Sequence, residues 1–192
     1  MRGISRLLII IVSSIFFLYQ GCKSEDEKEQ QLPAHGMSDM AGDVAYTIPD
    51  EWKVEKPSNA MRKAQFRIPG VEDFGDAEMA VFVFPGGGGA VQANINRWIG
   101  QFKQPDGSES MEKVEVKKIE SGEFPVTIVY VTGTYQSGSM GGPVSELTDH
   151  AMIAAIVETS TDPWFFKTTG PATTINHWRQ SFEKFAGTMR HK

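Results

Sequence analysis

Hydrophobic and polar residues alternate along several short segments of this chain, a pattern typical of strands with one face in a core. These segments are Val44, Tyr46 and Ile48; Ala64, Phe66 and Ile68; and Val114 and Val116. The residues between them are small or polar. Each segment therefore predicts a strand with one side facing solvent.

Other segments are apolar at nearly every position. They span residues 77–84, 126–131 and 151–157, and residues 164–167 predict a final short strand. Strands that are apolar on both sides need a covering layer on each face of their sheet. Short connections near Gly122–Glu123 and Gly138–Gly142 favour antiparallel pairing.

Two segments with apolar residues at helical spacing can supply these covers. The first stripe is Val91, Ile95, Trp98, Ile99 and Phe102, and the second is Ile175, Trp178, Phe182, Phe185 and Met189. Pro171 suits the first turn of the second helix, where a missing amide hydrogen has no cost. We therefore expect an α+β fold over residues 44–190, with a mainly antiparallel sheet of about six to seven strands covered by two helices.

A resemblance agrees with this expectation. Trp52, Met61-Arg62-Lys63-Ala64, Phe66 and Pro69-Gly70, followed by AEMAVFVFPGGGG and ANINRWIGQF, resemble uncharacterised bacterial exported proteins and lipoproteins. Their order of elements is similar to the PsbP-like α/β/α sandwich, which a photosystem extrinsic protein and a nuclear-import factor share. The resemblance covers about residues 44–190. Its motifs are structural, so it implies a fold and no activity.

The N-terminal region has the layout of an export signal. Arg2 and Arg6 precede an apolar run over residues 7–19, and Gly21 and Cys22 close it. A cysteine after a small residue resembles the lipobox of bacterial lipoproteins, which implies cleavage before Cys22 and acyl chains on its sulfur. The apolar run would form a helix of about 20 Å, short for a bilayer core of about 30 Å. A plain secretory signal and a retained anchor are the alternatives.

The next segment, residues 22–43, is acidic and polar, which predicts a flexible tether between the lipid anchor and the domain. Without Arg2 and Arg6, 17 of the 19 Lys and Arg residues remain against 24 Asp and Glu, a net charge of −7. Such a charge repels phosphate backbones and argues against nucleic-acid binding. Cys22 is the only cysteine, so the domain has no disulfide and no catalytic thiol.

A glycine run is the first candidate binding element. Gly86, Gly87, Gly88 and Gly89 lie between a predicted strand and a predicted helix, where backbone amides can hold an anion. Ala90-Val91-Gln92 follow in place of the lysine and hydroxyl residue of a phosphate-binding loop. We interpret the run as a tight connection that can also contact a ligand or a protein partner.

Two alternatives involve chemistry. His150 could act with a loop serine, Ser139 or Ser145, in an exported hydrolase, although no G-x-S-x-G elbow is present. Copper could bind a thioether and imidazole cluster in the tether. That cluster consists of His35, Met37 and Met40. Trp52 is the aromatic residue that we expect at a sheet edge, where it could mark a binding groove.

The sequence favours a non-enzymatic function. We expect a membrane-tethered lipoprotein of the bacterial cell envelope, on the outer membrane or the periplasmic face, attached through Cys22. It would act as an accessory or binding module for a protein or small ligand. We expect no catalytic residues, no metal and no cofactor. The hydrolase and the copper-handling protein remain alternatives.

Overall fold

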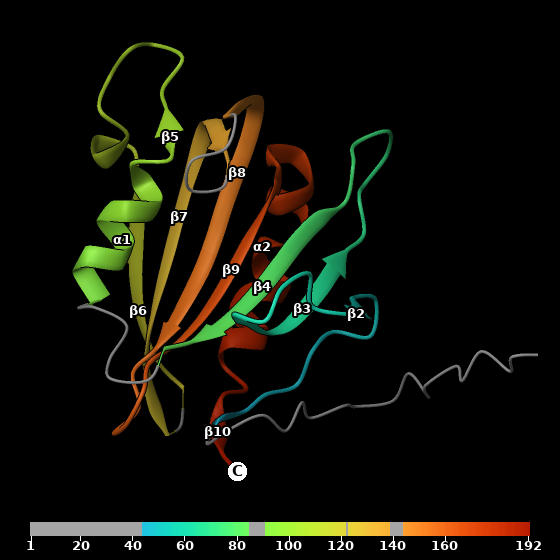
Figure 1. Cartoon of the computed structure of the whole chain (residues 1–192), viewed down its shortest axis with the longest axis vertical. Helices are drawn as coiled ribbons and strands as arrows, with labels where there is room; N and C mark the ends of the chain where they lie inside the picture. The colour runs from blue at the N-terminus through green and yellow to red at the C-terminus, as the bar shows by residue number, and fades with distance from the viewer. Residues whose placement is uncertain (1–43, 85–90, 122, 139–143) are drawn as a thin grey trace, which may run out of the picture. The chain divides into compact units, whose positions relative to one another are not determined.

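The computed structural model describes residues 44–84, 91–121, 123–138 and 144–192. In this part of the chain a large sheet has one helix on each of its faces (Figure 1). The elements are β1 (Val44–Ala45), β2 (Lys53–Glu55), β3 (Arg62–Ile68), β4 (Ala77–Val83), α1 (Val91–Ile99), β5 (Phe102–Lys103), a 3-10 helix (Ser110–Glu112), β6 (Glu115–Ser121), β7 (Phe124–Ser137), β8 (Ser145–Val157), β9 (Trp164–Pro171), α2 (Ala172–Ala186) and β10 (Arg190–His191). The predicted α+β class, with a mainly antiparallel sheet and two helices, is confirmed.

The described part of the large sheet has eight strands, in the order β2-β3-β4-β9-β8-β7-β5, with β6 also paired to β7. Each of these pairs is antiparallel. The sheet exceeds the expected six to seven strands because β2 and β5 are too short to show an alternating pattern. The strands that are apolar on both sides, β4, β9, β8 and β7, lie in its interior.

The first predicted strand is shorter than expected and belongs to another sheet. Only Val44 and Ala45 form β1, which pairs with β10 in a two-stranded sheet. Tyr46 is 1% exposed, and its ring packs edge-on against Phe166 with the centroids 5.1 Å apart. Packing of this ring in the core, rather than continued strand pairing, determines the path of the chain here.

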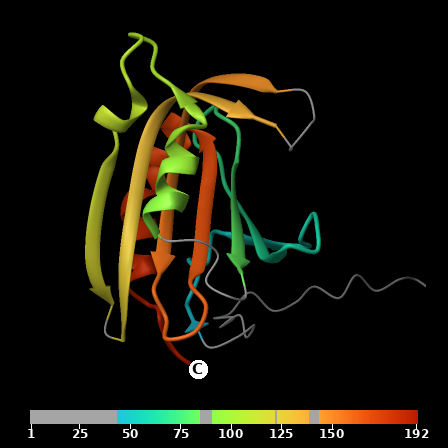
Figure 2. The same ribbon diagram turned by 60° about the vertical axis from the view of Figure 1, so that its left-hand side comes forward.

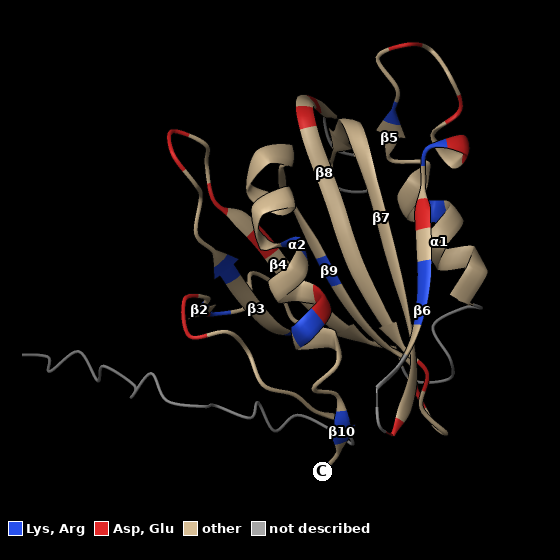
Figure 3. Ribbon diagram, turned by 180° about the vertical axis from the view of Figure 1, so that it is seen from behind, with Lys and Arg blue, Asp and Glu red and all other residues tan. Residues whose placement is uncertain are grey.

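Helix α2 covers one face of the sheet and packs mainly against β8 and β9. The predicted stripe is confirmed: Ile175, Phe182 and Phe185 are buried and Trp178 is half-buried against the same core. Pro171 precedes the helix as its cap, one residue earlier than expected. Ion pairs of Arg179 with Glu115 (2.5 Å) and of Lys117 with Glu183 (2.7 Å) join α2 to β6, where charged segments face each other (Figure 3).

Trp52 directly precedes β2, the edge strand of the large sheet, as predicted, but its ring is buried in this core and so does not mark a groove open to a ligand. Its side chain is 3% exposed. The ring contacts Trp178 edge-on at 6.4 Å between centroids and lies 5.4 Å from the ring of Phe185. An aromatic ring gains more by burial against other rings than by exposure at an edge.

Helix α1 covers part of the opposite face through Ile95, Trp98 and Ile99. The apolar stripe predicted a helix that continues to Phe102, but the helix ends at Ile99. Gly100 donates its amide hydrogen to the Asn96 carbonyl (2.9 Å) and follows the last helical residue. Phe102 is still buried, but it reaches the core from β5 instead of from the helix.

Strands β7 and β8 extend beyond the predicted apolar segments and bend. Their register shifts between Gly133 and Tyr135, and Asp149 adopts a positive φ of 52° opposite this point. Gly133 has a φ of 146°, and a Cβ there would lie 2.6 Å from the Lys103 carbonyl oxygen. Because Gly133 has no side chain, β5 can pair closely with β7 at this point. Beyond it, the ends of β7 and β8 turn away from the sheet (Figure 2).

Candidate functional site

The face of the sheet that carries α1 is divided into two halves. Under the helix, β7, β8 and β9 present buried apolar side chains such as Val129, Ala154 and Phe165. Over β2, β3 and β4 no helix of the described residues covers this face (Figure 1). Apart from Ala80 and Phe82 of β4, the side chains on that half are polar, and we call these polar side chains the polar face. It consists of Glu55, Arg62, Gln65, Arg67, Glu78 and Lys167.

Strand register explains this division. One row across the sheet runs from Glu55 through Gln65, Ala80 and Lys167 to Ala154, each directly opposite the next. Residues directly opposite each other in antiparallel strands point to the same side. The row is therefore polar on β2 and β3, carries Ala80 on β4 and Lys167 on β9, and ends with Ala154 of β8 in the apolar cluster under α1.

Gln65 is the centre of a hydrogen-bond network on the polar face and is 6% exposed. Its Nε2 donates to Glu55 (3.1 Å) and Glu78 (3.0 Å), while its Oε1 accepts from the Arg62 guanidinium (2.8 Å) and the Ser58 amide (3.0 Å). These four bonds use the full capacity of a primary amide. The side chains around Gln65 are therefore held in defined positions.

Arg67 connects two carboxylates at the margin of the polar face. It pairs with Glu55 at 3.2 Å and with Asp76 at 3.1 Å. A hydrogen bond from the Gly70 amide, followed by one from Arg67, lowers the pKa of Asp76. Because the Arg67 side chain is 53% exposed, solvent screens these pairs and each contributes at most about 1 kcal/mol to stability.

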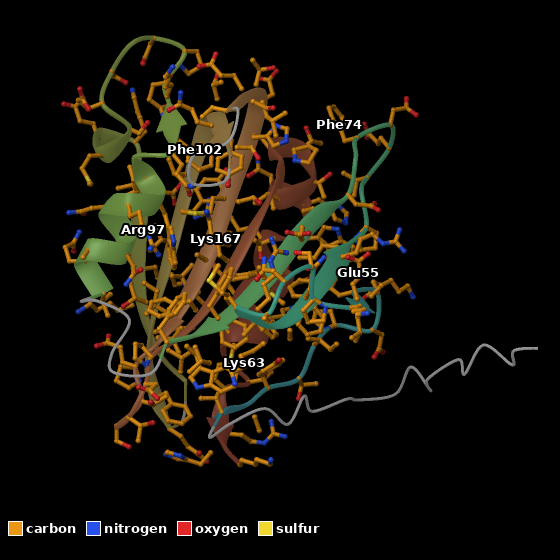
Figure 4. The ribbon with its side chains drawn as sticks, viewed as in Figure 1. Glu55, Lys63, Phe74, Arg97, Phe102 and Lys167 are labelled. Atoms are coloured by element: carbon orange, nitrogen blue, oxygen red, sulfur yellow. The ribbon has the colours of Figure 1, made fainter. Side chains whose placement is uncertain are left out.

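Lys167 lies at the boundary between the polar face and the apolar half, between α1 and β4 in Figure 4. Its Nζ donates to Gln101 Oε1 (2.6 Å) and lies 5.4 Å from the centre of the Tyr135 ring. Burial, followed by the charges of Arg97 and Arg62, lowers the pKa of Lys167 to about 8. A lysine in such surroundings is a candidate functional group.

The bent end of β7 positions the groups around Lys167. The Gln136 amide donates to the Gln101 carbonyl (2.7 Å), which fixes the residue that accepts the lysine hydrogen bond. The ring of Tyr135 packs on Phe102 with centroids 5.1 Å apart. Burial raises the pKa of the Tyr135 hydroxyl, and the charge of Glu78 adds to this effect, so the phenol is neutral near pH 7.

His150 does not have the partners of a hydrolytic histidine in the described residues. It lies within β8, and its Nδ1 is 2.8 Å from the Thr148 carbonyl oxygen. No serine, cysteine or carboxylate with a described side chain is hydrogen-bonded to its ring. Ser145 lies five positions earlier on the same strand, about 16 Å away along an extended chain. Ser139 lies outside the described residues.

Several predicted sites also lie outside the described residues. They are Cys22, the cluster of His35, Met37 and Met40, and the run Gly86, Gly87, Gly88 and Gly89. These stay predictions. Within the described ranges no group of three or more His, Cys, Asp or Glu could hold a metal ion. Nor does any helix in those ranges have the length and apolarity needed to cross a membrane.

Lys167 and Gln65 were not among the residues predicted from the sequence. A signal for Lys167 was present, because it directly follows the apolar residues Trp164, Phe165 and Phe166 in a strand that is buried on both sides. A charged residue in such a strand is rare unless something compensates its charge. Gln65 occupied a position that the alternating pattern assigned to solvent, and nothing in the local sequence indicated its network.

Neither a protein-family model nor a curated protein matches the chain. Among solved structures it is similar to cyanobacterial PsbP from Synechocystis, with a TM-score of 0.49, 11% identity, and coverage of 82% of this chain and 92% of that chain. A protein of unknown function from Pseudomonas aeruginosa, described as a putative regulator, gives 0.44 at 12% identity and coverages of 77% and 91%. A Bacteroides thetaiotaomicron structure gives 0.43 at 13% identity, with coverages of 78% and 45%.

Proposed function

We propose that this chain is an exported, membrane-tethered and non-enzymatic binding module that recognises its ligand or partner with the polar face. The observation that carries this proposal is the network around Gln65, which holds charged groups in fixed positions on a half-sheet that no described helix covers. A rigid sheet that presents prearranged polar groups favours recognition, because little order is lost when a ligand binds.

The same observations favour binding over hydrolysis. The polar face contains acids and bases, but Glu55, Glu78 and Arg62 are engaged with one another through Gln65. A general base needs a free lone pair within reach of a substrate proton, and a nucleophile needs such a base beside it. His150 contributes neither arrangement among the described residues. We therefore propose recognition without chemical conversion.

Membrane tethering is supported by the sequence alone. The basic residues, the short apolar run and Gly21-Cys22 have the order of a lipoprotein signal. With acyl chains on Cys22, the mature protein enters the detergent phase after Triton X-114 partitioning, and Cys22→Ser moves it to the aqueous phase. Unchanged partitioning of the Cys22→Ser variant would instead show that the apolar segment is retained as the anchor.

Use of the polar face can be tested by site-specific photo-cross-linking in the native host. A cross-linkable residue at Lys53, which is exposed and directly opposite Arg67, samples the polar face. The same residue at Lys184, exposed on α2, samples the other side of the sheet and serves as the control. We expect a specific adduct by mass spectrometry at Lys53 only. Equal or absent adducts at both positions contradict the proposal.

A further inference from the structure

Lys167 of the polar face and Arg97 of helix α1 have no carboxylate partner among the described residues. Eight ion pairs join basic and acidic side chains in this part of the chain, and none of them includes Lys167 or Arg97. Among the internal residues whose side chains the structure does not describe, 85–90, 120–122 and 139–143, only Glu120 is acidic, and it lies opposite Pro125 in the pair of β6 and β7. The described part of the domain therefore does not pair these two charges as it pairs Arg62 and Arg67.

Both cations are bound to neutral amide oxygens instead. Lys167 donates to Gln101 Oε1 at 2.6 Å, and Arg97 donates from Nη2 to Asn94 Oδ1 at 2.7 Å within α1. An ammonium group has three donors and a guanidinium has five. Each cation therefore retains donors for a further acceptor, and Gln101 and Asn94 hold them in place.

We propose that Lys167 and Arg97 together bind an oxyanion, a carboxylate or phosphate group carried by a small ligand. This inference rests on the proposed binding role of the polar face and specifies the chemistry of its ligand. A guanidinium matches the two oxygens of such a group in its planar fork, and an ammonium adds a compact positive charge. The ring of Tyr135, whose centre lies 5.4 Å from Lys167 Nζ and which packs on the buried Phe102, provides apolar surface for the rest of the ligand.

The electrostatics around Lys167 agree with the geometry. The charged and titratable groups around it are Arg97 from α1, Arg62 from β3 and Tyr135 from β7. Glu78 from β4 is hydrogen-bonded to Arg62, and its charge acts on Tyr135. Its direct neighbours across β4 and β8 are Ala80 and Ala154, which carry no charge. Burial and like charge both disfavour the ammonium form, so an anion beside it would relieve the cost of both.

A purely structural lysine is the competing explanation. In that case the aliphatic stem packs on the sheet, and the hydrogen bond to Gln101 only satisfies the ammonium group. The two explanations differ in what an added anion does. A structural lysine gives no saturable binding, whereas the proposed site binds an oxyanion with an affinity that depends on both Lys167 and Arg97.

Isothermal titration calorimetry of the purified protein can distinguish them, with inorganic phosphate, acetate and benzoate as separate probes. We expect at least one of them to bind with a Kd of about 1 mM or tighter. If phosphate binds most tightly, the natural ligand carries a phosphate group. If benzoate binds more tightly than acetate, the ligand carries a carboxylate next to an apolar group. Failure of all three to bind in this range overturns the proposal.

Matched variants assign the binding to this site. Lys167→Met retains the stem and removes the charge, and we expect a loss of affinity of about tenfold or more. Arg97→Gln, on the exposed surface of α1, should weaken binding while the fold is preserved. Lys103→Met removes the same charge from an exposed residue that is paired with Glu146, and should change the affinity by less than about twofold. Equal losses in Lys167→Met and Lys103→Met contradict the site.

Two further readouts separate a failed site from a failed fold or a failed function. Lys167→Arg keeps the charge and should retain most of the affinity, even if Lys167→Met perturbs folding. Affinity should fall as the pH rises above about 8, because the free protein then loses the Lys167 proton.

If cross-linking at Lys53 succeeds but no oxyanion binds, this inference fails and the proposed function stands. Oxyanion binding without a specific Lys53 adduct supports the anion site and contradicts recognition through the whole polar face.

Discussion

The two faces of the sheet differ in how completely they are covered. On the α2 side a continuous core runs from β3 to β7 and includes Tyr46, Trp52 and the aromatic residues of the helix. On the α1 side the buried cluster is limited to β7, β8 and β9, where it meets α1 and β5. Beyond it lies the polar face, with its hydrogen bonds and ion pairs.

This difference separates the regions that stabilise the domain from the region available for binding. The α2 side buries aromatic rings in contact with one another, which contributes most of the hydrophobic stabilisation. The polar face gains less from burial and instead keeps charged groups in fixed geometry. A domain without disulfides can accept this arrangement because one of its cores extends from β3 to β7.

The largest predicted effect comes from two adjacent residues on opposite faces. Phe166 is fully buried on the α2 side among the rings of Tyr46, Trp164 and Phe185. Phe165 is 1% exposed under α1. We expect Phe166→Ala to lower the free energy of unfolding by about 4 to 5 kcal/mol, and Phe165→Ala by about 3 kcal/mol, because the shorter α1 can relax into the space. Urea denaturation measures both, and the reverse order would contradict the comparison.

A smaller effect is predicted for the network of the polar face. Gln65→Leu removes the amide that joins Glu55, Glu78 and Arg62, and leaves their charges without this partner. We expect a loss of about 1 to 3 kcal/mol in the free energy of unfolding. Arg67→Gln, on a half-exposed side chain of the same face, should cost less than about 1 kcal/mol. Similar losses in the two variants would show that the network has no special role.

The smallest predicted effect is a pH dependence of stability. The pKa of Lys167 is about 8 in the folded protein, against a usual value of 10.5. Between these values the unfolded chain binds a proton that the folded protein has lost, so the stability contribution of Lys167 rises with pH. We expect a rise on the order of 1 to 2 kcal/mol relative to Lys167→Met, since residual solvent contact reduces the full shift. Parallel pH profiles of the two proteins in chemical denaturation would contradict the lowered pKa.

Local patterns predicted the elements in which one apolar face dominates. The alternation of Ala64, Phe66 and Ile68 corresponds to β3, and the second helical stripe corresponds to α2. The patterns failed where distant contacts override local ones. Phe102 continued the helical stripe, yet it lies in β5, because Gly100 follows the last helical residue and Tyr135 on the bent β7 offers its ring a partner.

The candidate site depends on such distant contacts almost entirely. Lys167 meets Gln101 across 66 residues of sequence, and this contact requires the bend at Gly133 that lets β5 approach β7. Likewise, Gln65 occupied a polar position of an alternating strand, and its carboxylate partners Glu55 and Glu78 come from the two neighbouring strands. The hydrogen bonds of these residues could not be read from their own segments.

The sequence by itself determined the two helices and the longer strands, since the spacing of their apolar residues requires each to bury one face or two. It also determined the expectation of export, from the order of charge, apolar run and cysteine. Tertiary structure alone decided that the described helices leave half of one sheet face uncovered, and that Lys167 at its boundary donates to Gln101 and is affected by the charge of Arg97 on α1. The physical reason is that strand register and helix placement result from packing between segments far apart in the chain.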